Sequence, residues 1–177
     1  AWELSHGIAP RTIETPDGRK TTARKQLRAR YTLMELIKGE AIALLNYAFL
    51  VDKGVFPKNS DSAMAATFLA SFFDATRLAK SSPQTIAKSV IYNYLAKEWV
   101  FRYNPRSRNF EVNPPALRPA VRKLVGEVLQ IIARGDYTGA GRLIIQYGIL
   151  PGEVRDKLSE LNDVPVDIKP IYASMPQ

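Results

Sequence analysis

Apolar residues recur at helical spacing along most of the chain, and in one stretch they occupy almost every side of a helix. Within residues 24–54, the segment from Ala41 to Val51 contains only one strongly polar residue, Asn46. A helix that lacks a polar face is normally buried, so we expect the rest of the domain to pack around this segment. Gly54 is expected to end the helix, because glycine tolerates the left-handed conformation that follows a last helical turn.

Several other segments carry apolar residues three and four positions apart, which predicts amphipathic helices with one buried face. Proline near the start and glycine after the end mark some of their boundaries. We expect these helices at residues 61–80, 83–99, 114–134, 137–147 and 151–161. A shorter helix, closed by Gly7, is expected at the start of the chain.

One segment alternates apolar and polar residues as a β-strand does. Phe101 and Tyr103 precede the turn sequence Asn104–Ser107, and Phe110 and Val112 follow it. Two short alternating runs joined by a turn of this composition predict a β-hairpin. This is the only strand pairing that we expect from the sequence.

Together these patterns predict an all-α fold, a multi-helix domain around a buried central helix, with one short β-hairpin. Loops are expected at residues 8–22 and in the proline-rich tail from residue 164 onward. The chain has 177 residues, of which 46% are hydrophobic, and this is enough to bury one core. We therefore expect residues 1–177 to form a single domain.

The composition excludes several classes of function. Because the chain has no cysteine, it cannot form disulfides, thiolate metal sites or cysteine nucleophiles, and we expect a protein of a reducing compartment, the cytoplasm. No apolar run approaches the ~18 residues that a membrane span requires. The sequence starts with Ala1 instead of methionine, from which we expect a processed or excised product.

The formal net charge of +8 is concentrated in two clusters of basic residues. Such clusters attract phosphates and acidic surfaces. A solvated basic face explains them better, because no recognition helix or RNA-binding motif accompanies them, and we do not expect a nucleic-acid partner. The clusters are Arg19, Lys20, Arg24, Lys25, Arg28 and Arg30, then Arg102, Arg106, Arg108, Arg118, Arg122 and Lys123.

Candidate chemistry begins with the sequence Trp2-Glu3-Leu4-Ser5-His6. Two histidines four positions apart, with a glutamate after the first, make a zinc-hydrolase helix, because both rings face one metal ion and the glutamate activates its water. Here Trp2 occupies the place of the first histidine, and His6 is the only histidine in the chain. A two-histidine site therefore cannot form within one copy.

Several short motifs nevertheless point to one family. The chain contains SHGIAPRT, TTARKQLRARYTLMELIKGEA, LVDKG, YNYL, GDYTGA and PVDIKPIY. In these motifs it resembles the C-terminal part of the dipeptidyl peptidase III family of zinc peptidases, especially its bacterial branch. The resemblance extends over nearly all of the chain and rests on separate matches instead of one loose pattern.

The resemblance implies a zinc site and also indicates where it has changed. In the family, two histidines of a helical motif and the second glutamate of a glutamate pair hold the zinc, and a histidine-bearing loop assists. Carried over, the first histidine matches Trp2, the catalytic glutamate matches Glu3 and the second histidine matches His6. The glutamate pair matches Glu35 and Leu36, and the histidine-bearing loop matches residues 81–84, where no histidine remains.

Two of the three implied zinc ligands thus cannot coordinate a metal, so we expect a degenerate, metal-free site with no cofactor. Glu40 lies one helical turn beyond Leu36, but it would reach the old metal position only if the helix shifted. Tryptophan and leucine in place of ligands favour an apolar pocket. We expect Trp2, Glu35, Leu36 and Glu40 to line this pocket together with His6.

Glu35, Lys38 and Glu40 stand in the turns just before the apolar half of the central helix. Charges at the entrance of a buried helix are expected to be either paired or functional.

Two functions of different classes remain open, and nucleic-acid binding through the basic clusters is a third and weaker alternative. The first is a non-catalytic binding or scaffold domain derived from a zinc peptidase, which would accept a small apolar or peptide ligand. The second is an enzyme: either a metal-free acid–base catalyst that uses Glu3 and His6, or a zinc-dependent hydrolase completed by another chain. In either case we expect a homodimer or a complex with another protein chain, because the family places this region against a large N-terminal part.

Overall fold

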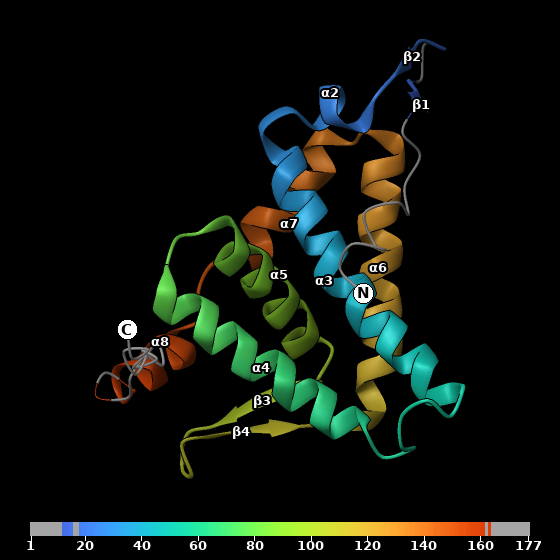
Figure 1. Cartoon of the computed structure of the whole chain (residues 1–177). Coiled ribbons are helices and arrows are strands. Elements are labelled where there is room, and N and C mark those ends of the chain that lie inside the picture. The colour runs from blue at the N-terminus through green and yellow to red at the C-terminus, as the bar shows by residue number, and fades with distance from the viewer. Residues whose placement is uncertain (1–11, 16–17, 162, 164–177) are drawn as a thin grey trace, which may run out of the picture.

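The computed structural model describes residues 12–15, 18–161 and 163, and the expected helix at residues 1–7 and the tail from residue 164 lie outside this part (Figure 1). The all-α prediction is confirmed. The helices are α2 (Ala23–Leu27), the 3-10 turn η1 (Arg28–Arg30), α3 (Tyr31–Asp52), α4 (Asp61–Leu78), α5 (Pro83–Lys97), α6 (Pro114–Arg134), α7 (Tyr137–Tyr147) and α8 (Gly152–Ser159). None of the helices in the described part is both long and apolar enough to cross a membrane.

Helix α3 is the central element, and it packs against α5 and α6 (Figure 1). Met34, Ile37 and Ala41 on its inner face are fully buried. The helix ends as expected: the Val55 amide donates to the Leu50 carbonyl at 2.9 Å, and Gly54 has a φ of 74°. This left-handed residue lets the last turn satisfy its carbonyls, as in other glycine-terminated helices.

The apolar half of α3 is covered on its inner side, whereas its outer side is more open. Ala48 and Val51 are buried, Leu45 and Leu50 are half-buried, and Phe49 is 57% exposed. The lack of a polar face therefore does not mean burial all round, because α5 and α6 cover only part of the circumference. An exposed apolar strip on a central helix is consistent with a further contact surface.

The chain before α3 is not one continuous helix, because α2 and η1 meet at a sharp backbone turn. Arg28 has a φ of 48° and a ψ of −124°, a conformation that non-glycine residues rarely adopt. The turn leaves Leu27 fully buried. It also lets the Arg30 guanidinium lie 3.7 Å from the centre of the Tyr137 ring at the start of α7.

The predicted hairpin is confirmed and closes one side of the core. Strands β3 (Phe101–Asn104) and β4 (Asn109–Val112) pair antiparallel, with Phe101 opposite Val112. The Phe101 ring stacks on Phe68 of α4 at 5.9 Å and on Tyr92 of α5 at 5.6 Å. The hairpin therefore joins α4 and α5 through an aromatic cluster.

A second, shorter strand pair lies in the segment expected to be a loop. Strands β1 (Ile13–Glu14) and β2 (Lys20–Thr21) pair antiparallel, and the Gly18 amide donates to the Thr15 carbonyl at 2.8 Å. Each strand has only two residues, too few to show the alternation from which strands are predicted.

Candidate functional site

The structure locates only some of the residues proposed for the pocket. Trp2, Glu3 and His6 lie outside the described residues. Glu35, Leu36 and Glu40 all belong to α3. The described part of the candidate site therefore lies along α3.

Glu35 forms an ion pair within α3. Its Oε2 atom lies 2.7 Å from the Lys38 ammonium, and the Lys38 side chain is only 1% exposed. A charge this deeply buried requires a partner, because desolvation of an unpaired ammonium would cost several kcal/mol. Nearby, burial raises the pKa of the Tyr31 hydroxyl, and the negative charge of Glu35 raises it further. Glu35 therefore acts as a fixed counter-charge at the beginning of α3.

Glu40 is paired with a residue from a different helix. The Lys88 ammonium of α5 lies 3.1 Å from Glu40 Oε1 and donates to Ser71 Oγ of α4, also at 3.1 Å. It lies 5.8 Å from the centre of the Phe68 ring. The Lys88 and Glu40 side chains are 11% and 29% exposed. This cluster ties α3, α4 and α5 together at one point. Of the two expected alternatives, paired or functional, the structure shows pairing for Glu40.

Leu36 supplies no polar group to this region. It is half-buried and packs against the hydrophobic core. Leu36 and Glu40 are four positions apart and share a side of α3, whereas Glu35 and Glu40 are five apart and so about 140° apart around the helix. The two carboxylates therefore point to different sides of α3, and each has its own lysine.

A groove with a cavity volume of about 250 Å³ lies between α3 and α4 next to Glu40. Ala43 of α3 and Ala63 of α4 contribute small side chains, which leave the space open. Tyr47 stands at the other end from Glu40 and stacks on Phe56 at 4.7 Å. Glu35 and Leu36 do not line the groove. The lining residues are Glu40, Ala43, Leu44, Tyr47, Ala63, Met64, Thr67, Phe68 and Ser71.

The described residues do not fit the zinc site that the resemblance implies. Within residues 12–15, 18–161 and 163, no three histidine, cysteine, aspartate or glutamate side chains are grouped so that they could share a metal ion. Leu36 has no lone pair to offer, and Lys38 and Lys88 already neutralise the neighbouring carboxylates. A zinc ion near Glu40 would have to compete with a lysine ammonium for the same oxygens.

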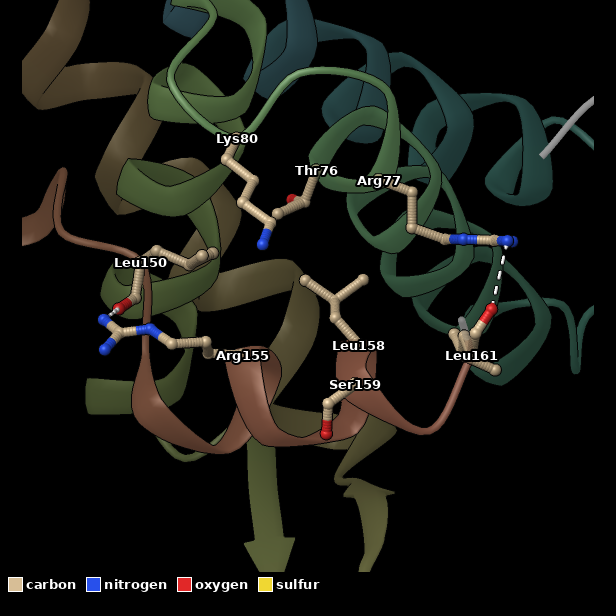
Figure 2. Close-up of a pocket in the computed structure, with 8 residues that line it drawn as sticks. All are labelled: Thr76, Arg77, Lys80, Leu150, Arg155, Leu158, Ser159 and Leu161. Atoms are coloured by element: carbon tan, nitrogen blue, oxygen red, sulfur yellow. Dashed lines mark hydrogen bonds between the residues drawn. The ribbon is translucent and has the colours of Figure 1, made fainter. Parts of the chain in front are cut away.

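A second pocket, with a cavity volume of about 280 Å³, lies between the end of α4 and α8 (Figure 2). Three of its lining residues are cations: Arg77, Lys80 and Arg155. No sequence pattern predicted this pocket, because Arg155 is far from the other two cations along the chain and belongs to no motif. The same holds for Lys88 and Ser71 at the first groove.

No family model matches the chain. Over 172 residues it is 32% identical to Nudix hydrolase 3 of Arabidopsis thaliana, and the match covers 96% of this chain and 22% of that protein. A structure of DPP III from Caldithrix abyssi superposes with a TM-score of 0.89 at 32% identity. A structure of dipeptidyl-peptidase III from Corallococcus sp. strain EGB superposes with a TM-score of 0.86 at 30% identity.

These similarities define a hydrolase-related domain. More specifically, the chain has a dipeptidyl peptidase III-like fold, because 96% of it superposes on both solved structures. It spans about a third of the length of those two structures and about a fifth of the Arabidopsis relative. The resemblance drawn from the sequence motifs is confirmed at the level of the fold.

Proposed function

We propose that this chain is a non-catalytic binding domain derived from a zinc peptidase, with a remodelled, metal-free site next to α3. The observation that carries the proposal is the state of the α3 carboxylates. Glu35 and Glu40 are each engaged by a largely buried lysine, and Leu36 stands where the resemblance expects the zinc-binding glutamate. Internal ammonium groups take the place that a metal cation would have beside these carboxylates.

The groove between α3 and α4 is the proposed binding surface. Its walls are mainly apolar, with Leu44, Met64 and Phe68 at its base, and it carries a neutral Glu40–Lys88 ion pair at one end. An added cation would be repelled by Lys88, and an added anion by Glu40. A small uncharged apolar ligand, or an apolar side chain of a peptide, suits this combination best.

The first experiment measures zinc content and peptide hydrolysis of the purified full chain. If the proposal is right, the protein contains no stoichiometric zinc and does not hydrolyse peptides from which a dipeptide would be released. Stoichiometric zinc together with hydrolysis would overturn it in favour of a zinc enzyme completed by a second copy. Hydrolysis without zinc, abolished by Glu3→Gln and by His6→Gln, would favour the metal-free acid–base catalyst instead.

A second experiment tests the groove itself with an environment-sensitive apolar dye. Ala63→Trp places a large side chain at an exposed position of the groove, so we expect it to reduce dye binding about tenfold by filling the space. Ala66→Trp is the matched control, because Ala66 is also exposed on α4 but does not line the groove. Equal dye binding by both variants and the unmodified chain would locate the ligand elsewhere.

A further inference from the structure

The pocket between α4 and α8 has an unusual charge content for its size. Arg77, Lys80 and Arg155 line it, and none of its eight lining residues is acidic. Figure 2 shows the Lys80 side chain reaching from the end of α4 toward α8. Cations gathered around one small cavity repel one another, so the cavity has a positive potential that favours an anion.

Basic residues at the end of a helix often serve only to cap its free carbonyl groups, but here another residue does so. The oxygen of the buried Thr85 hydroxyl lies 2.7 Å from the Ala79 carbonyl oxygen and 3.1 Å from the Ala75 carbonyl oxygen, and the two carbonyls share its one hydrogen. The Ser82 amide also donates to Ala79, at 3.2 Å. The end of α4 is therefore fixed without Lys80, which is left exposed on an ordered turn.

The existing contacts of the two arginines differ. Arg77 donates to the Leu161 carbonyl at 3.2 Å and takes part in further interactions, so it is engaged. Arg155 reaches the Leu150 carbonyl only at 3.5 Å, beyond the ordinary 2.7–3.2 Å range for such bonds. An incoming anion can therefore recruit Arg155 and Lys80 at little cost.

Glu160, the residue that follows α8, is engaged by other cations. Glu160 accepts a hydrogen bond from Lys157 at 2.8 Å and is also paired with Arg108 of the β3–β4 turn. The hydrogen bond from Lys157 and the charge of Arg108 lower the pKa of Glu160, so it stays ionised and committed to these partners. Glu160 is thus committed to cations outside the pocket.

Beneath the cationic rim the pocket is apolar. Leu150, Leu158 and Leu161 line it, and Leu158 is buried within the core cluster. A bare inorganic anion would leave these leucines uncovered, whereas an aliphatic chain would cover them. We propose that this pocket binds a small organic acid, with its carboxylate between Lys80 and Arg155 and its apolar body against the three leucines.

Isothermal titration calorimetry of the full chain tests the proposal with hexanoate and octanoate as probes, and with 1-octanol and inorganic phosphate as comparisons. We expect octanoate to bind best, with affinity rising ~fourfold for each methylene group that the leucines bury. Lys80→Met and Arg155→Gln should each weaken octanoate about tenfold, because each removes a charge-assisted contact.

Lys58→Met and Arg122→Gln are matched controls, since both residues are exposed and lie outside the pocket. All four positions are on the surface, so unchanged melting temperatures are expected and are measured alongside. Equal binding of 1-octanol and octanoate would overturn the proposed carboxylate contact. Phosphate binding as tight as octanoate binding, control variants with the same loss, or no binding at millimolar octanoate would each overturn the proposal as well.

Discussion

At the scale of single residues, the contact between Glu40 and Lys88 has the largest consequences. Two partly buried charges carry a desolvation cost, which the 3.1 Å ion pair and the hydrogen bond to Ser71 offset. Removal of only one partner leaves the other charge without compensation. Removal of both replaces the pair with apolar surface, which a site next to Leu44 and Phe68 can accept.

We therefore predict that Lys88→Met lowers the free energy of unfolding by about 1–3 kcal/mol, because it leaves the Glu40 carboxylate partly buried and unpaired. The double variant Lys88→Met/Glu40→Leu should recover to within about 1 kcal/mol of the unmodified chain. Urea denaturation of Lys88→Met, of Glu40→Leu and of the double variant gives the coupling energy between the two side chains. Strictly additive losses would mean that the two side chains do not interact in solution.

At the scale of elements, the sequence predicted the ends of helices that are marked by a proline at the start or a glycine after the last turn. Helix α6 begins at Pro114 and ends before Gly135, which has a φ of 60°, as its proline and glycine indicated. The break between α2 and α3 was not predictable, since its left-handed residue is Arg28 and not glycine. Leu78, the last residue of α4, is apolar and yet 64% exposed.

The candidate site was only partly predictable for a different reason. The sequence indicated that Glu35 and Glu40 would be either paired or functional, and Glu35 is paired with a residue one turn away within the same helix. For Glu40 the partner is Lys88, which α5 brings close only in the folded chain. Helical periodicity predicts which side of a helix a residue faces, but not which residue of another helix it meets.

Two glycines associated with α6 should respond in opposite ways to the same substitution. Gly126 lies inside the helix, and a Cβ atom there would meet no atom within 4 Å other than its chain neighbours and the backbone of its own helix. Gly126→Ala should therefore raise the free energy of unfolding by about 0.5–1 kcal/mol. At Gly135 the φ of 60° disfavours alanine, and its Cβ would lie 2.6 Å from Gln26 Cβ and Ile13 Cδ1.

We expect Gly135→Ala to lower the free energy of unfolding by more than about 1 kcal/mol. Thermal and urea denaturation of the two variants, run in parallel, measure both effects. A stabilised Gly135→Ala variant would contradict the close approach of β1 and α2 to the end of α6.

At the scale of the whole molecule, apolar side chains gather where α3 ends. Phe49, Val55 and Phe56 are exposed there, and Phe56 continues the groove through its stacking on Tyr47. Exposed apolar surface of this kind usually meets a partner. The chain also corresponds to only about a third of the length of the structures that share its fold.

We therefore predict a homodimer, or a complex with another protein chain, that buries more than ~1,000 Å² in total. Light scattering at protein concentrations of tens of micromolar should detect the homodimer. Phe49→Lys should weaken the homodimer, because it places a charge in the exposed apolar surface. Ile145→Lys is the control, because Ile145 is also an exposed large apolar residue but lies on α7.

A Trp99→Phe variant leaves Trp2 as the only tryptophan, so its fluorescence reports on Trp2 alone. A strict monomer in which the Trp2 fluorescence is already that of a buried indole would contradict the predicted assembly.

The lysines beside Glu35 and Glu40 bear on how this fold depends on its surroundings. A carboxylate that is neutralised by a metal ion loses its counter-charge when the metal is scarce or is chelated. Here both counter-charges are covalent parts of the chain, supplied by Lys38 and Lys88 at synthesis. Under the proposed function, the folding of α3 against α5 would be independent of the zinc supply of the cell, and a mutational change to metal binding would have to remove a lysine as well as supply the ligands that the resemblance expects.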